Sequence, residues 1–251
     1  MNKLVVLISV VTSGIAAAQG ALGQASGSPV VVELFTSEGC SSCPPADRLL
    51  TALDKEQPVK GVQVIVLSEH VDYWNTGGWA DPYSSHEFSE RQQRYGEALH
   101  IADVYTPQAV VDGRWEVVGN NAPKLEGAIA QARKEKKIPL RLQVSRSDKG
   151  IHVDLRAEGD VPRGAELYFA VAEDAVESKV SAGENSGRML AHTAVVRSLT
   201  KAGKLADAGE NGVSMDLKAS GRWGKHLRVV ALLEERAGGK ILGATMAGLA
   251  E

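Results

Sequence analysis

The chain has 251 residues, of which 43% are hydrophobic and 24% are charged. These fractions are typical of a globular protein and exclude a disordered or fibrous chain. The formal net charge of −3 at pH 7 gives no electrostatic footprint for nucleic acid, so we expect no nucleic-acid partner.

The first residues have the order of a secretory signal peptide. Lys3 precedes the apolar run Leu4–Val11, and small residues then continue through Ala18 to Ala25. We expect cleavage after Ala18 or Ala25, which assigns residues 1–25 to the signal peptide and places the mature chain in the periplasm or outside the cell. The apolar run is far shorter than the ~20 residues that a spanning helix needs, so no transmembrane segment is expected in the mature chain.

Residues 26–137 alternate between strand and helix patterns. Apolar runs that end in turn residues predict strands, and amphipathic stretches with Ser, Pro or Asn at their start predict helices. In chain order these are a strand over Val30–Thr36, a helix from about Cys43, a strand over Val62–Leu67, a helix over His86–Leu99 after the N-cap Ser85, a hairpin of Ala109–Val111 and Trp115–Val118 around Asp112-Gly113, and a helix over Asn121–Lys137. The pattern predicts one α/β domain.

The pattern changes at Ile138, after which period-two alternation recurs at short spacing. The expected strands are Leu140–Ser145, Ile151–Ala157, Glu166–Glu173, Ala191–Leu199, Val213–Leu217, Leu227–Glu235 and Lys240–Met246. This spacing is typical of a sandwich of two antiparallel sheets. We therefore expect an all-β sandwich-like domain over residues 138–251.

Cys40 and Cys43 are the only cysteines, so each has only the other as an intramolecular disulfide partner. As a structural staple the pair is weak, because so short a loop contributes roughly 2 kcal/mol in the loop-entropy model. As a redox pair it is well placed, because the dipole of the helix that starts near Cys43 lowers the pKa of a thiol at Cys40. Cys40 is then the exposed, attacking sulfur, and Cys43 is the buried, resolving one.

A metal site is the third interpretation of the pair. Two thiolates fall short of the usual four zinc ligands, whereas copper(I) would need one further ligand such as His70. Two classes of function follow: a thiol–disulfide oxidoreductase with no cofactor beyond the disulfide, and a non-catalytic copper(I)-binding or chaperone-type module using Cys40, Cys43 and His70. The oxidoreductase would act on protein thiols or disulfides, and a membrane reductase is a further candidate partner.

The order of elements around the cysteines is similar to the thioredoxin fold, and Thr106-Pro107 before the third strand strengthens that resemblance. Thioredoxin-like proteins carry a cis proline at that place, opposite the cysteine pair. The resemblance implies that Pro107 is cis and contacts the sulfurs, and that the backbone of Thr106 positions an extended substrate. It also implies a buried acid that helps to deprotonate the resolving thiol, and Glu33 lies near that place, offset by one residue.

Longer stretches from both halves of the chain carry a more specific resemblance. They are Glu33–Asp47, His70–Trp74, Gly78–Pro82, Arg91-Gln92, Tyr105–Gln108, Gly183–Arg188 and His192–Arg197. They resemble a family of secreted, thioredoxin-like bacterial proteins classed as a domain of unknown function (family twelve-twenty-three). The resemblance covers most of the mature chain and is nearly silent on the substrate.

The loop after the second strand carries further candidates. His70 leaves that strand and Asp72 and Trp74 follow, so this loop is expected to cover the cysteine pair and to take part in substrate binding. His70 has the titration range to assist proton transfer. Three polar residues of the second half are expected to make an interdomain contact: Arg188, His192 and Arg197.

Overall fold

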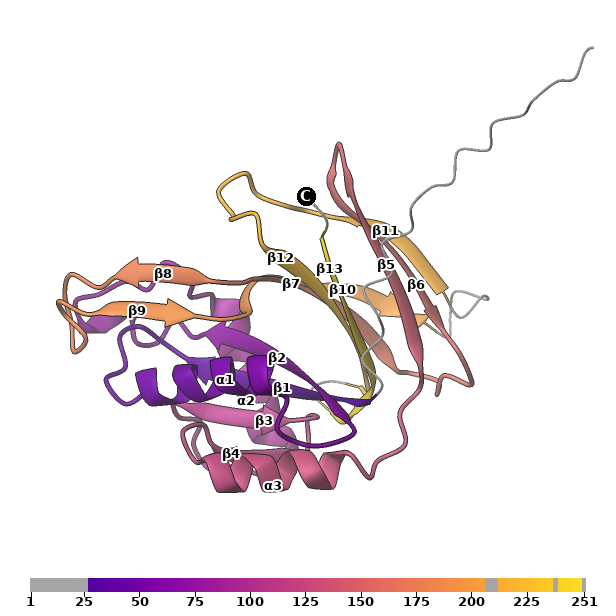
Figure 1. Ribbon diagram of the computed structural model, residues 1–251, viewed down its shortest axis with the longest axis horizontal. Helices are drawn as coiled ribbons and strands as arrows, with labels where there is room; N and C mark the ends of the chain where they lie inside the picture. The colour runs from indigo at the N-terminus through magenta and orange to yellow at the C-terminus, as the bar shows by residue number, and fades with distance from the viewer. Residues whose placement is uncertain (1–26, 206–211, 237–238, 250–251) are drawn as a thin grey trace, which may run out of the picture.

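The computed structural model describes residues 27–205, 212–236 and 239–249 of the chain. The expected signal peptide, residues 1–25, lies outside the described residues. Within these ranges the chain forms thirteen strands and three α-helices (Figure 1). None of these helices is long and apolar enough to cross a membrane.

The helices are α1 (Pro44–Glu56), α2 (His86–Ala98) and α3 (Ala122–Ala132), with a short 3₁₀ helix at Asn75–Gly77. The strands are β1 (Ser28–Thr36), β2 (Val62–His70), β3 (Gln108–Val111), β4 (Trp115–Val118), β5 (Leu140–Ser147), β6 (Gly150–Ala157), β7 (Glu166–Glu173), β8 (Val176–Lys179), β9 (Met189–His192), β10 (Val195–Lys204), β11 (Gly212–Leu217), β12 (Leu227–Glu234) and β13 (Ile241–Gly248).

Eight strands form one mixed sheet in the order β13-β12-β7-β10-β2-β1-β3-β4. β1 and β2 pair in parallel, and β10 joins the other edge of β2, also in parallel, at Val195 opposite Ser68. The Ser68 amide there donates to the carbonyl of Ala194 at 2.9 Å. Strands from both sides of Ile138 therefore lie in a single sheet.

The expected fold class, a thioredoxin-like α/β domain over residues 26–137 followed by an all-β sandwich-like domain, is wrong. Most of the individual elements were predicted, but the period of an apolar pattern does not say which strands pair with which. Strands β7, β10, β12 and β13 extend the sheet of β1–β4 instead of forming a second, separate sandwich. The molecule is consequently dominated by one large mixed sheet with few helices.

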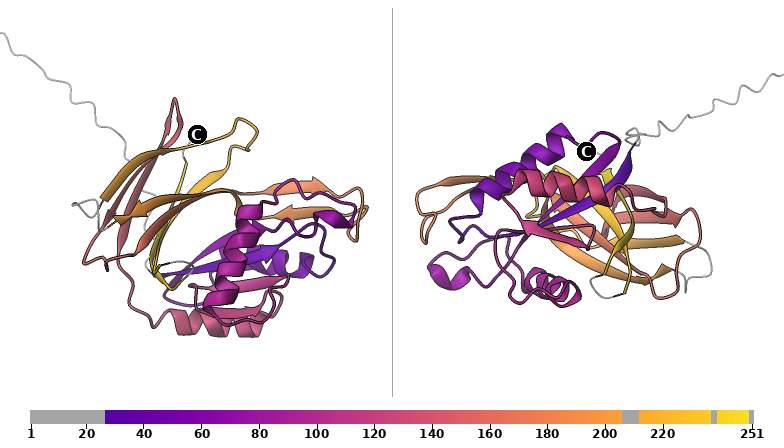
Figure 2. Two further views of the ribbon diagram at one scale, coloured as in Figure 1. Left: turned by 180° about the vertical axis from the view of Figure 1, so that it is seen from behind. Right: turned by 90° about the horizontal axis from the view of Figure 1, so that it is seen from below.

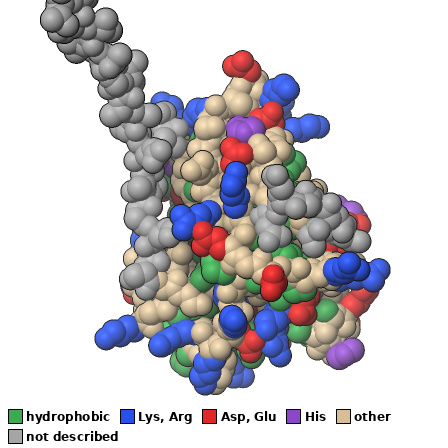
Figure 3. Space-filling view, turned by 90° about the vertical axis from the view of Figure 1, so that its right-hand side faces the viewer, with side chains coloured by type: hydrophobic (Ala, Val, Ile, Leu, Met, Phe, Trp, Pro, Cys, Tyr) green, Lys and Arg blue, Asp and Glu red, His purple; other side chains and the backbone are tan. Residues whose placement is uncertain are grey.

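A smaller sheet, of order β11-β6-β5, packs against the C-terminal strands of the large sheet (Figures 1 and 2). Val153 and Leu155 of β6 share a buried cluster with Phe169 and Val171 of β7. On the face shown in Figure 3, Lys and Arg side chains are interspersed with Asp and Glu.

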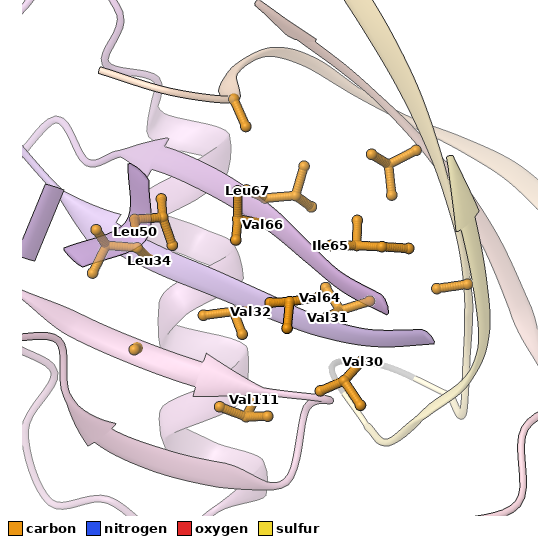
Figure 4. Close-up of a cluster of buried hydrophobic side chains, with 14 of the residues drawn as sticks. Val30, Val31, Val32, Leu34, Leu50, Val64, Ile65, Val66, Leu67 and Val111 are labelled. Atoms are coloured by element: carbon orange, nitrogen blue, oxygen red, sulfur yellow. The ribbon is translucent and has the colours of Figure 1, made fainter. Parts of the chain in front are cut away.

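The two faces of β1 contact different helices, because successive side chains of a strand point to opposite sides. Leu34 shares a core with Leu50 of α1 (Figure 4). Phe35 instead meets Tyr95 of α2 edge to face, with ring centroids 6.1 Å apart. This alternation decides which polar residues of β1 can approach the cysteines.

Local sequence signals near the helices and turns are confirmed. The Ser85 hydroxyl caps α2 by accepting from the Glu87 amide at 3.3 Å. Asp112 and Gly113 both have positive φ, 50° and 66°, at the centre of the turn that the Arg114 amide closes on the Val111 carbonyl at 3.0 Å. Helix α3 ends earlier than the expected Lys137, whose ammonium turns inward to the carboxylate of Asp112 at 2.7 Å.

Strands β8 and β9 form a separate hairpin that projects beyond the large sheet and lies over the first half of the chain (Figure 1). We call residues 176–192 the covering hairpin. The sequence pattern does not predict β8, and it predicts one strand over Ala191–Leu199 where the structure has two, separated at Ala194 with φ of 52°. This hairpin determines the surroundings of the cysteines.

Candidate functional site

The cysteine loop, residues 37–43, joins β1 to α1. Cys40 and Cys43 form a disulfide with their Cα atoms 5.4 Å apart. Cys43 is the N-cap of α1 and Pro44 follows in its first turn, where a missing amide N–H has no cost. The Cys40 Sγ lies 3.3 Å from the hydroxyl of Ser42. The disulfide is therefore at the positive end of the α1 dipole.

Neither cysteine has any exposed surface, although Ser41 and Ser42 between them are exposed. The expectation that Cys40 is the exposed sulfur is therefore wrong for this structure. The pattern around the cysteines did not indicate their burial, because part of their surroundings comes from the covering hairpin, far away in the sequence.

The covering hairpin binds the main chain on both sides of Cys40. The side-chain amide of Asn185 donates to the carbonyl oxygens of Glu38 and Cys40 at 2.8 and 2.9 Å. The Ser41 amide donates to a carboxylate oxygen of Glu184 at 3.0 Å. Asn185 is fully buried by this contact, so the tip of the hairpin is seated on the cysteine loop.

The carboxylate of Glu38 is buried between the cysteine loop and the covering hairpin. It accepts from the indole N–H of Trp79 at 2.8 Å and from the hydroxyl of Ser178, and it lies 3.3 Å from Nε2 of His192. A buried carboxylate requires such partners. We call residues 73–83, between β2 and α2, the 73–83 loop. Glu38 thus joins the cysteine loop to the 73–83 loop and to both strands of the covering hairpin.

His70 and Asp81 form a buried pair, with Nδ1 and Oδ2 2.7 Å apart. Burial opposes the charged imidazolium, but the carboxylates of Asp81, Asp47 and Glu38 outweigh it and raise the pKa of His70. Burial likewise opposes the ionised carboxylate, but His70 and the amides of Glu38 and Tyr83 lower the pKa of Asp81 to about 2. The charged forms of the two groups thus stabilise each other.

The ring of His192 connects this pair to helix α1. It lies edge-on to the ring of His70 with centroids 4.7 Å apart, and its Nδ1 is 3.8 Å from Oδ2 of Asp47. Asp47 follows Cys43 by one helical turn and accepts from the Thr36 hydroxyl at 2.8 Å. Burial raises the pKa of Asp47, although His192 and His70 oppose this.

We call these five buried residues the histidine–carboxylate cluster: Glu38, Asp47, His70, Asp81 and His192. His192 brings the second half of the chain into it, so the contact expected between the two halves is confirmed for that residue. It is also confirmed for Arg197, whose guanidinium lies 5.0 Å from the ring centroid of Tyr83. Arg188 instead donates to Asn185 within the covering hairpin at 2.8 Å.

Pro107 is cis, as the resemblance implied. A Cβ added to Gly119 would lie within 3.3 Å of Leu34, Pro107 and Ala46 together. Because Ala46 is in the first turn of α1, Pro107 lies beside the helix that begins after Cys43. Gly119 has no side chain, which leaves room for this close approach.

Trp74 connects Thr106 to the cysteine loop, as expected of the loop after β2. Its indole N–H donates to the Thr106 hydroxyl at 2.7 Å. Its Cβ and carbonyl oxygen lie 3.1 and 3.3 Å from the point that a Cβ on Gly39 would occupy. Trp74 therefore packs directly against the cysteine loop.

The bonds of the Asp72 side chain go to helix α2. Its carboxylate accepts from the Ser89 hydroxyl at 2.5 Å and lies 3.2 Å from Nδ1 of His86. The bond from Ser89, followed by the contact with His86, lowers the pKa of Asp72. Asp72 therefore lies beside the first turn of α2, although it is not part of that helix.

Glu33 also contacts α2. Its two carboxylate oxygens bind Nε of Arg91 and the hydroxyl of Tyr95, each at 2.5 Å. Thr36 points to the opposite face of β1 and binds Asp47 of α1. Glu33 therefore lies on the face of β1 away from α1, because successive side chains of a strand point to opposite sides, and the acid on the Thr36 side is Asp47 of α1 itself.

The three residues considered as copper(I) ligands, Cys40, Cys43 and His70, contact other groups in this structure. The two sulfurs are bonded to each other, and Nδ1 of His70 faces Asp81. Among the described residues, no group of three or more His, Cys, Asp or Glu could hold a metal ion.

Four residues of the site were not singled out from the sequence: Glu38, Asp47, Asp81 and Asn185. Each lies within a stretch that carries the family resemblance, and that resemblance is the sequence signal that could have indicated them. Their roles depend on contacts between segments that are far apart in the chain.

The site and fold define a protein with a buried disulfide at the N-terminus of a helix. A family model described as a protein of unknown function (DUF1223) matches residues 31–234, which include the cysteine loop and the covering hairpin. The chain belongs to this family.

The chain is similar to a crystal structure of a protein from Agrobacterium tumefaciens, with a TM-score of 0.68 and 27% identity over 89% of this chain and 95% of that one. A β-glucosidase structure from Kluyveromyces marxianus, with a TM-score of 0.18 and 20% identity over 45% and 15% of the two chains, carries no argument. No curated protein matches this chain.

Proposed function

We propose that this protein is a thiol–disulfide oxidoreductase whose Cys40–Cys43 pair alternates between disulfide and dithiol. The observation that carries the proposal is a disulfide between residues only three apart, at the start of α1 and beside the histidine–carboxylate cluster. So short a ring stabilises a fold by only roughly 2 kcal/mol, which makes a purely structural role a poor explanation. Buried groups with shifted pKa values gather at functional sites.

Cys40 is assigned as the attacking sulfur. In the reduced protein, the α1 dipole and the Ser42 hydroxyl near the Cys40 sulfur would stabilise a thiolate there. Cys43 is the N-cap of α1, whereas Cys40 lies three residues earlier in the cysteine loop. Cys43 is therefore assigned as the resolving sulfur.

The exchange proceeds in two displacements. The Cys40 thiolate attacks one sulfur of a substrate disulfide, that bond breaks, and the first substrate thiolate leaves as a mixed disulfide forms. The Cys43 thiolate then attacks the Cys40 sulfur, the Cys40–Cys43 bond forms, and the second substrate thiolate leaves. Two electrons pass from the cysteine pair to the substrate, and the reverse sequence oxidises a substrate dithiol.

Protons accompany the two electrons. The resolving thiol must lose a proton when it attacks and regain one when the pair is reduced. Asp47 lies one helical turn after Cys43, its amide donates to the Cys43 carbonyl at 3.1 Å, and burial raises its pKa. We assign Asp47 as the group that exchanges a proton with Cys43.

The substrates proposed are protein thiols or disulfides in the periplasm or outside the cell, where disulfides persist. The signal peptide expected over residues 1–25 supports that compartment. A membrane reductase is proposed to regenerate the dithiol.

The test is covalent capture of a substrate. Cys43→Ser is expected to trap mixed disulfides through Cys40, whereas Cys40→Ser is expected to trap almost none. The wild-type protein is expected to accelerate the reduction of insulin disulfides by dithiothreitol, and the double Cys→Ser variant is the control. The proposal fails if neither single variant captures a substrate and the wild type matches the double variant.

A further inference from the structure

The burial of the disulfide imposes a condition on any exchange reaction. A substrate sulfur must touch the sulfur that it attacks, yet Cys40 and Cys43 have no exposed surface. Asn185 and Glu184 of the covering hairpin bind the main chain on both sides of Cys40. Exchange therefore requires a segment around the cysteine loop to move, and the covering hairpin is bound directly to that loop.

We propose that the covering hairpin is a latch that closes the Cys40–Cys43 site and opens to admit a polypeptide substrate. Asn185 is the residue that holds the latch closed. This inference rests on the proposed function, since only an exchange reaction requires access to the sulfurs.

The hairpin forms a two-stranded sheet of its own. β8 and β9 pair only with each other and belong to neither larger sheet. Ala175 lies just before β8 and Ala194 just after β9. Both have a left-handed backbone conformation, with φ of 55° and 52°. Small residues at the ends of elements are common hinge positions, because they absorb changes of φ and ψ.

The contacts that hold the tip are few and polar. Asn185 supplies two hydrogen bonds and Glu184 one, and the neighbouring Gly183 lies against Trp79 of the 73–83 loop. The other face of the hairpin meets solvent, as the 63% exposure of Met189 shows. The tip around Asn185 is therefore released when these three hydrogen bonds break, while Ser178 and His192 keep the rest of the hairpin bound to Glu38.

Opening also indicates the class of substrate. The groups released by the hairpin are the carbonyls of Glu38 and Cys40 and the amide of Ser41, all of them main-chain groups around the attacking sulfur. An extended polypeptide carries donors and acceptors that match them. The hairpin thus occupies the place that a substrate chain takes when the latch is open.

The experiment measures the rate at which tris(2-carboxyethyl)phosphine reduces the disulfide, followed by alkylation and mass spectrometry. Asn185→Ala removes both hydrogen bonds to the cysteine loop, together with the bond from Arg188, and is expected to raise this rate roughly thirtyfold, which corresponds to about 2 kcal/mol for the two bonds to the loop. Met189→Ala, on the exposed side of the same hairpin, is the matched control and is expected to keep the wild-type rate. Glu184→Gln weakens a bond at an exposed residue and is expected to raise the rate by a smaller factor.

Hydrogen exchange at the Ser41 amide provides a second measurement, and it should be faster in both latch variants than in Met189→Ala. If Asn185→Ala does not fold, the reduction rate and the Ser41 amide exchange of Glu184→Gln test the latch. The latch is overturned if the folded variants react within twofold of the wild type and their Ser41 amides exchange at its rate. Because the phosphine assay needs no protein substrate, a faster rate combined with failed substrate capture would overturn the proposed function and leave the latch intact.

Discussion

The guanidinium of Arg228 and the carboxylate of Asp54 are joined by two parallel hydrogen bonds, each of 2.8 Å, which tie β12 to α1. The same guanidinium binds Asp174, next to Ala175 at the base of the covering hairpin, at 2.6 and 2.9 Å. A lysine ammonium cannot make both bidentate contacts. We expect Arg228→Lys to lower the free energy of unfolding in urea by roughly 1–3 kcal/mol.

The control for this prediction is Arg141→Lys, because Arg141 pairs with Glu158 on the exposed surface. Exposed pairs contribute little, so a change below about 0.5 kcal/mol is expected there. Equal losses in the two variants would contradict the importance of the Arg228 contacts.

The acid stability of the protein should depend on Asp81. Its pKa of about 2 in the folded protein is below the ordinary 3.8, so it contributes stability that is present above about pH 4 and lost as the pH falls through 2. Asp81→Asn should therefore unfold about 2 kcal/mol more easily at pH 5, with a smaller difference from wild type at pH 2. Urea titrations at both pH values measure this, and a constant difference would contradict it.

Glu69 should make the protein less stable as the pH rises, which is opposite to the effect of Asp81. Its carboxyl oxygens have no hydrogen-bond partner in the described part of the chain, and one lies 3.6 Å from Nε of Arg91. Burial, followed by the nearby Glu33, raises the pKa of Glu69 well above its usual value. Above about pH 4.5 the unfolded chain loses this proton and the folded chain keeps it, so wild-type stability falls as the pH rises.

Glu69→Gln keeps the shape of the side chain and removes this titration. Between pH 5 and pH 8, the stability of the variant relative to wild type is expected to rise by at least about 1 kcal/mol. Parallel profiles of unfolding free energy against pH would show that Glu69 is ionised in the folded protein.

Two helical glycines offer a matched pair of substitutions. A Cβ on Gly127 of α3 would meet nothing within 4 Å, so Gly127→Ala should stabilise the protein by about 0.5–1 kcal/mol through helix propensity. A Cβ on Gly96 of α2 would lie 3.0 Å from Cγ1 of Val104, so Gly96→Ala should stabilise less or destabilise. Thermal unfolding compares the two, and a larger gain at Gly96 would contradict the prediction.

Local features were predictable because their causes are local. The N-cap at Ser85, the turn at Asp112 and the helix that begins after Cys43 each depend on a few adjacent residues. The pairing of β10 with β2 depends on residues as far apart as Val195 and Ser68, which no short pattern encodes.

The same limit applies to the candidate site. The cysteine pair was found from its spacing and cis Pro107 from the resemblance, whereas Glu33 contacts α2 and Asp47 of α1 lies on the other side of β1. The burial of Cys40 was not found, because the residue that binds its carbonyl is Asn185 in the other half of the chain.

The distance in sequence between the cysteines and their cover has a consequence for synthesis of the protein. Ribosomes complete Cys40 and Cys43 long before Asn185 and His192, so the nascent chain carries both thiols without the hairpin while the residues between are added. An oxidant can therefore form the bond while the sulfurs are still accessible, and the hairpin docks on a loop whose covalent structure is already complete. The order of residues along the chain thus sets the order of events: oxidation first, enclosure second.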